Sequence, residues 1–122
     1  GAPVAAAWYQ LMSSRPSPDG KRTIDISGTP VTDPYLANLT HLTRIDSLLL
    51  GQHITDVGVS NILTLTNISY FALHNSNVDS NGLKAVLKGY PKLKNLSLFH
   101  VKAFIGTINW KAYPHVKLEA AF

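Results

Sequence analysis

The chain has 122 residues, of which 45% are hydrophobic and 15% are charged, and its formal net charge is +4. This composition is too apolar and too weakly charged for a disordered chain, and the length fits one domain with a core of its own. The sequence has no cysteine, which excludes disulfides and thiolate metal sites. No apolar run approaches the ~20 residues of a membrane span, so we expect no transmembrane segment.

The positive charge is concentrated in the second half of the chain. Residues 1–61 hold four basic and five acidic side chains, whereas residues 62–122 hold seven lysines and two acids. A basic half can attract an anionic polymer. The lysines are spread over several predicted elements and no nucleic-acid-binding motif accompanies them, so solubilising charge is the favoured interpretation and nucleic acid is not an expected partner.

The first 20 residues differ from the rest of the chain. Residues 1–12 are rich in alanine and predict a helix with an apolar end, and residues 13–20 contain two prolines and a glycine that interrupt it. We interpret residues 1–20 as a helical cap followed by a linker. Residues 21–122 are predicted to form the main domain.

An apolar-x-apolar block recurs along the main domain. The spacing is 24 residues from Ile24 to Leu48, 23 from Leu48 to Phe71, and 25 from Phe71 to Leu96. Alternation of this kind predicts a short strand in each block. The blocks are Ile24-x-Ile26, Leu48-x-Leu50, Phe71-x-Leu73 and Leu96-x-Leu98, with a degenerate fifth copy at Val116-x-Leu118.

A second block keeps the same phase and predicts a helix after each strand. Residues 31–36, 54–59 and 78–83 align with one another, and apolar residues continue on one helical face beyond each of them. Asp33, Asp56 and Ser80 occupy the positions where a helix N-cap is expected, because their side-chain oxygens can accept a hydrogen bond from a helix N–H.

The segment from Phe104 to Trp110 departs from this pattern. It lacks a helix N-cap, and its side chains are too apolar for a solvated loop. We interpret it as a C-terminal cap. In the alternative interpretation, in which the protein is a subunit of a larger complex, the segment is an interface.

These blocks resemble the leucine-rich repeat family, whose pattern is L-x-x-L-x-L-x-x-N/C-x-L. Residues 68–78 follow that pattern except for Ser76 at the Asn position, where the first repeat has Thr29. The resemblance implies an α/β solenoid of about four repeats with an N-terminal helical cap. Short parallel strands would line its concave face and helices its convex face. It also implies that Ser76 and Thr29 hydrogen-bond backbone groups of their turns.

The phrases at residues 36–43 and 65–69 are similar to bacterial surface leucine-rich repeat proteins of the internalin type. This resemblance implies an adhesin-like or cell-envelope module, secreted or on the surface of a bacterium. A cytoplasmic location is the alternative. The partner implied is a macromolecule, foremost a protein, with a glycan or anionic polymer as other options.

The strand register predicts which side chains line the face away from the helices. Leu49, Tyr70, His74 and Phe99 are the expected partner-binding anchors, because aromatic residues are enriched in interfaces. Asp25, Asn95, Ser97 and Lys117 complete the predicted partner-binding set. In strand order the outward positions are Thr23, Asp25 and Ser27; Ser47, Leu49 and Gly51; Tyr70, Ala72 and His74; Asn95, Ser97 and Phe99; and His115, Lys117 and Glu119.

Catalytic and metal chemistry find little support in the sequence. Ser97, His74 and Asp25 can be drawn as a triad across three strands, but no strained nucleophile turn accompanies them. His74 and His100 lack a third zinc ligand. We therefore expect a non-catalytic protein–protein or protein–glycan interaction module without a cofactor. The alternative is an intracellular adaptor or regulatory subunit of a larger complex.

Overall fold

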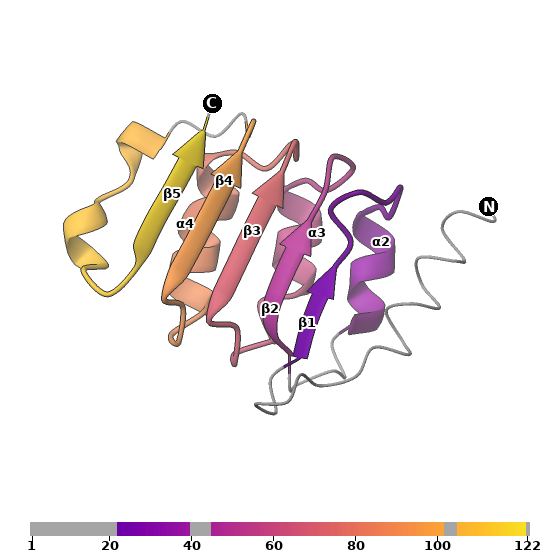
Figure 1. Ribbon diagram of the computed structural model, residues 1–122, viewed down its shortest axis with the longest axis horizontal. Helices are drawn as coiled ribbons and strands as arrows, with labels where there is room; N and C mark the ends of the chain where they lie inside the picture. Colours follow the sequence, from indigo (N-terminus) through magenta and orange to yellow (C-terminus); the bar gives the residue numbers. More distant parts are fainter. Residues whose placement is uncertain (1–21, 40–44, 102–104, 122) are drawn as a thin grey trace.

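Five strands form a single parallel sheet in which each strand lies beside the next one in the chain. The computed structural model describes residues 22–39, 45–101 and 105–121, so the predicted N-terminal cap at residues 1–20 lies outside the described residues. Figure 1 shows the strands side by side in chain order. The strands are β1 (Arg22–Asp25), β2 (Ile45–Leu50), β3 (Tyr70–His74), β4 (Asn95–Phe99) and β5 (Lys117–Ala121).

The pairing register confirms the alignment of the first four apolar blocks. Ile24 pairs with Leu48, Leu48 with Phe71, and Phe71 with Leu96. The predicted fifth copy is wrong by two residues, because Leu118 rather than Val116 pairs with Leu96. The block at the fifth strand is therefore Leu118-x-Ala120, which is less apolar than the other blocks and gives a weaker signal in the sequence.

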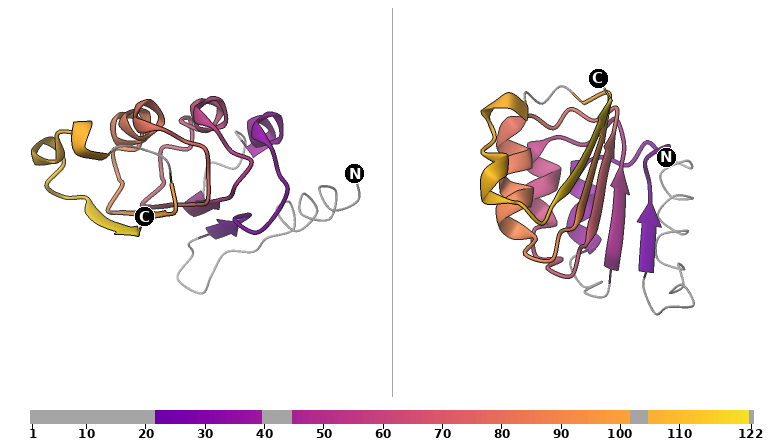
Figure 2. Two further views of the ribbon diagram at one scale, coloured as in Figure 1. Left: turned by 90° about the horizontal axis from the view of Figure 1, so that it is seen from above. Right: turned by 60° about the vertical axis from the view of Figure 1, so that its left-hand side comes forward.

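Helical segments connect the strands, because parallel neighbours require a crossover. They lie together on one face of the sheet, as the view from above shows (Figure 2). No helix among the described residues is long and apolar enough to cross a membrane. The segments are α2 (Asp33–Leu36), η1 (Ala37–Leu39), α3 (Asp56–Asn61), α4 (Ser80–Gly89), η2 (Ile105–Thr107) and η3 (Trp110–Ala112).

The core fills the space between the sheet and the helices. Leu48, Phe71 and Leu96 from the strands are fully buried there. Tyr90 follows α4, and its ring lies 5.6 Å from that of Phe71. Its hydroxyl donates a 2.8 Å hydrogen bond to the carbonyl of Ile62, so the core contains a satisfied polar group. Burial raises the pKa of Tyr90 well above its usual value.

The predicted N-caps are displaced by one residue. The capping residues are Thr32, Thr55 and Asp79; Thr55 accepts from Val57 N and Asp79 from Asn81 N, whereas Thr32 makes no side-chain cap bond. The predicted capping residues are instead the first residues of α2, α3 and α4. This position lets two of their carboxylates contact the next strand–helix unit instead of their own helix.

Asp33 and Asp56 each bind the unit that follows. Asp33 accepts hydrogen bonds from Thr55 N at 2.8 Å and from Thr55 Oγ1 at 2.5 Å. Asp56 accepts a 2.9 Å bond from Asp79 N. A glycine accompanies each carboxylate, and a Cβ at Gly58 would lie 2.2 Å from Asp33 Oδ1. A Cβ at Gly82 would likewise lie 2.3 Å from Asp56 Oδ1, so both glycines make room for a carboxylate.

The turns after the strands match the family-based expectation only in part. Thr29 Oγ1 donates a 2.8 Å bond to the carbonyl of Ile26, as expected. Ser76 is buried, and its hydroxyl has no hydrogen-bond partner among the described residues, so the corresponding expectation is wrong. The turn after β2 is shorter, and a Cβ at Gly51 would lie 2.3 Å from the carbonyl oxygen of Ser27.

The segment after β4 packs against the core. Ile108 is 6% exposed and belongs to the core cluster, and Ile105 and Trp110 pack against that cluster. Trp110 Nε1 donates a 3.1 Å hydrogen bond to the carbonyl of Ile105. Two short 3-10 turns, η2 and η3, therefore occupy the place where earlier units have an α-helix. Phe104 lies outside the described residues.

Candidate binding face

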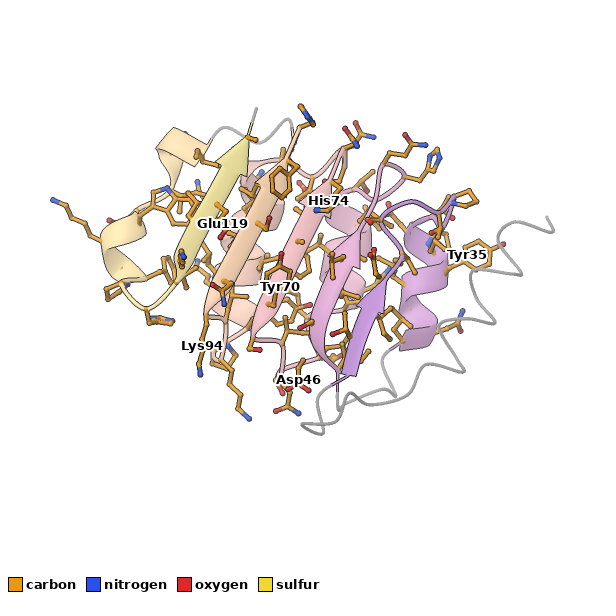
Figure 3. The ribbon with its side chains drawn as sticks, viewed as in Figure 1. Tyr35, Asp46, Tyr70, His74, Lys94 and Glu119 are labelled. Carbon is orange, nitrogen blue, oxygen red and sulfur yellow. The ribbon has the colours of Figure 1, made fainter. Side chains whose placement is uncertain are left out.

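The sheet has one face on which none of the described helices lies, which we call the open face. Its side chains form rows across the strands, because residues paired in register point the same way. Figure 3 shows Tyr70, His74 and Glu119 on this face. The first row is Thr23, Ser47, Tyr70, Asn95 and Lys117; the second is Asp25, Leu49, Ala72, Ser97 and Glu119; and the third includes His74, Phe99 and Ala121.

Larger side chains surround two small ones in the middle of this face. Ala72 and Ser97 are 0% and 1% exposed although both point away from the helices. In this structure Ser97 therefore exposes almost no surface, and its contact with a partner stays a prediction. Its hydroxyl has no hydrogen-bond partner among the described residues. Sequence register placed Ser97 on the correct face but did not predict that it is buried.

An apolar cluster of Leu49, Tyr70, His74 and Phe99 surrounds these buried residues. All four are half-buried. The ring of His74 meets that of Phe99 edge-on, with centroids 5.1 Å apart and planes at 84°. Because this pair fixes two rings on neighbouring strands, the cluster is partly ordered before any partner binds, which lowers the entropy cost of binding.

Polar residues lie toward the two sides of the apolar cluster. Asp25 on β1 is exposed, and its Oδ1 accepts bonds from the Ser27 amide at 3.0 Å and hydroxyl at 2.6 Å. Lys117 on β5 is exposed and pairs in register with the half-buried Asn95. His115 precedes β5 and so does not belong to the first row, contrary to the predicted order.

The structure does not bring the residues of the considered triad together. Asp25 is on β1 and Ser97 on β4, so two strands lie between them and the separation is about 14 Å at ~4.8 Å per strand. Among the residues that the structure describes, no three His, Asp or Glu side chains form a group able to hold a metal ion.

A groove at the strand starts is a feature that sequence reasoning missed. Its volume is about 380 Å³. Lys92 Nζ donates a 2.7 Å bond to Asn67 Oδ1 beside it. The loops that precede neighbouring strands meet at this groove. The only sequence signal for it is that Lys92, Lys94 and His115 all lie shortly before a strand. The lining residues are Asp46, Asn67, Ser69, Pro91, Lys92, Leu93, Lys94 and His115.

Comparisons with protein-family models, with curated proteins and with solved structures found no match for this chain.

Proposed function

We propose that this protein is a non-catalytic binding module of the leucine-rich repeat type, and that the open face is its contact surface for a protein partner. The sheet and its register support a stacked arrangement of strand–helix units. In that arrangement the helices cover the core, and no described helix covers the open face, which is then the surface for recognition. An adhesin-like role at a cell envelope belongs to the same proposal.

The observation that carries the proposal is the apolar cluster on the open face. Leu49, Tyr70 and Phe99 do not contribute to the core between the sheet and the helices, and burying them against a partner would release water from apolar surface. Tyr70 combines an apolar ring with a hydroxyl, the type of side chain that dominates interface energetics. Ala72 and Ser97, which are buried on the same face, support these side chains.

The alternative is an adaptor or regulatory subunit that uses the segment from Phe104 to Trp110. The burial of Ile108 and the internal hydrogen bond of Trp110 Nε1 favour a cap over a free interface. We therefore keep this alternative as the second candidate.

A pull-down with matched variants tests the proposal. Wild-type protein and the Tyr70→Ala/Phe99→Ala variant would be immobilised separately and exposed to soluble and envelope fractions of the source cells. Val57→Ala is the control, because Val57 is 63% exposed on α3, away from the open face. Circular dichroism would first establish that all three are folded.

A partner captured by wild-type protein and by Val57→Ala, but lost by the double variant, is the expected result. Truncating two interface anchors should weaken binding by ~2–4 kcal/mol, which corresponds to about 30-fold or more. A partner retained by the double variant would contradict the proposal and would direct attention to the helical face or to the C-terminal cap.

A further inference from the structure

The outer edge of β5 is the second feature of the sheet that can recognise another molecule. In the described residues β5 pairs with β4 alone, at the end of the strand order. Its side chains are exposed except for the half-buried Leu118. η2 and η3 lie toward the helical side of this strand and not in the plane of the sheet (Figure 2).

The backbone direction at this edge follows from two hydrogen bonds. Lys117 N donates to the carbonyl of Lys94 at 2.7 Å, and the carbonyl of Ala121 accepts from His100 N at 2.7 Å. In a parallel ladder alternate residues direct their N–H and C=O groups to the same neighbour. Lys117 and Ala121 therefore bond toward β4, and the backbone groups of Leu118 point to the outer edge.

We propose that this edge pairs with β5 of a second copy of the chain, antiparallel, about a two-fold axis at Leu118. An axis at Leu118 makes Leu118 and its counterpart a hydrogen-bonded pair, which uses the outward backbone groups of both copies. It also places Lys117 directly opposite Glu119 of the other copy, twice per dimer. Both side chains are exposed on the open face, and Leu118 adds apolar contact on the other face.

The registers with an axis at Lys117 or at Glu119 do not match the charges. An axis at Glu119 sets Glu119 against its own copy, and an axis at Lys117 does the same for that lysine; like charges directly opposite are destabilising. Continuing the sheet in parallel by adding β1 of another copy to β5 would put Asp25 beside Glu119, because both belong to the second row. The charge pattern thus favours a closed dimer over an open chain of copies.

Pairing along five residues buries a small area, so the dimer should be weak, with a dissociation constant between about 10 μM and 1 mM. Sedimentation equilibrium of the full chain up to ~1 mM would measure it. Lys117→Glu and Glu119→Lys should each weaken dimerisation about tenfold, because each replaces two attractive pairs by repulsive ones. Lys111→Glu on η3 is the matched control, with the same charge change at an exposed residue.

The two variants also allow a rescue. The Lys117→Glu/Glu119→Lys double variant should dimerise like the wild type, and a mixture of the two single variants should form heterodimers. A wild-type chain that stays monomeric at ~1 mM would overturn the proposal. So would a dimer that is indifferent to these changes, and loss of the dimer in Tyr70→Ala/Phe99→Ala would assign it to the open face instead.

Discussion

At the scale of single residues, the most informative side chains are two aspartates that bind the unit after their own. The carboxylate of Asp33 accepts hydrogen bonds from Thr55, and that of Asp56 accepts one from Asp79 N. Each carboxylate lies beside a glycine that leaves space for it. The sequence indicated these positions because they recur with the same spacing as the strands. It did not indicate their hydrogen-bond partners, because a carboxylate at the start of a helix can accept a bond from its own helix or from a neighbouring segment.

Gly58→Ala tests this arrangement. The new Cβ would displace the Asp33 carboxylate from its two hydrogen bonds with Thr55, which outweighs the gain in helix propensity of about 1 kcal/mol. We expect a net loss of about 1–3 kcal/mol in unfolding free energy, measured by urea denaturation.

A double-mutant cycle supplies the control for that prediction. In an Asp33→Ala background, Gly58→Ala should cost much less, because no carboxylate remains to be displaced. Gly28→Ala is a second control, since nothing lies within 4 Å of a Cβ built there. Equal costs of Gly58→Ala in both backgrounds would refute the contact.

The Asp56–Asp79 pair predicts a pH effect. Burial, followed by the hydrogen bond with Asp79, raises the pKa of Asp56, while the hydrogen bond with Asp56 lowers the pKa of Asp79. Because the pKa of Asp56 is higher in the folded protein than in the unfolded chain, Asp56 stabilises the fold at pH values below the pKa of the unfolded chain. This contribution is lost as the pH rises through the pKa of the folded protein. The lowered pKa of Asp79 has the opposite effect, because the stability that Asp79 contributes is lost as the pH falls through its folded-state pKa.

Asp56→Asn keeps the shape of the protonated acid at every pH. Its amide can accept from Asp79 N and donate to the Asp79 carboxylate. We expect the variant to be more stable than wild type at pH 7, with the difference shrinking as pH falls toward the raised pKa of Asp56. Thermal unfolding between about pH 3.5 and 7 would measure this. Asp25→Asn controls for the loss of one charge, and a difference independent of pH would count against the shared hydrogen bond.

At the scale of elements, strand positions were more predictable than helix lengths. The strands follow from alternation between a buried and an open face, and four of the five predicted apolar blocks were aligned correctly. The helical pattern of Val59, Ile62 and Leu65 continues beyond α3, which ends at Asn61, and Ile62 and Leu65 are buried in the connection that follows. The spacing of apolar residues indicates which side chains enter the core. The number of residues between two strands limits how many helical hydrogen bonds can form, and so determines the length of the helix.

The segment that contains η2 and η3 provides a prediction at this scale. Ile108→Ala should lower the unfolding free energy of the isolated chain by about 2–4 kcal/mol, because it leaves a cavity in the core. Asn109→Ala is the neighbouring exposed control and should change it by less than ~0.5 kcal/mol. If Ile108→Ala had no effect on stability, the segment would be better interpreted as the interface of a larger complex.

At the scale of the whole molecule, one layer of helices covers one face of the sheet and the other face carries the apolar cluster. Register alone predicted that Leu49, Tyr70, His74 and Phe99 share this face. Register did not predict the burial of Ser97, which depends on the size of the side chains around it. Nor did it predict the groove beside Lys94, which forms where loops between successive strands meet.

Site-specific photo-cross-linking is the most direct test of whether the open face binds a partner. A photoreactive amino acid would replace Leu49 on the open face or, in a separate protein, Val57 on the helical side, and both would be irradiated in the same cell fractions. A binding open face predicts an adduct with a foreign protein from position 49 and none from position 57. Adducts from position 57 alone would contradict the proposed contact surface.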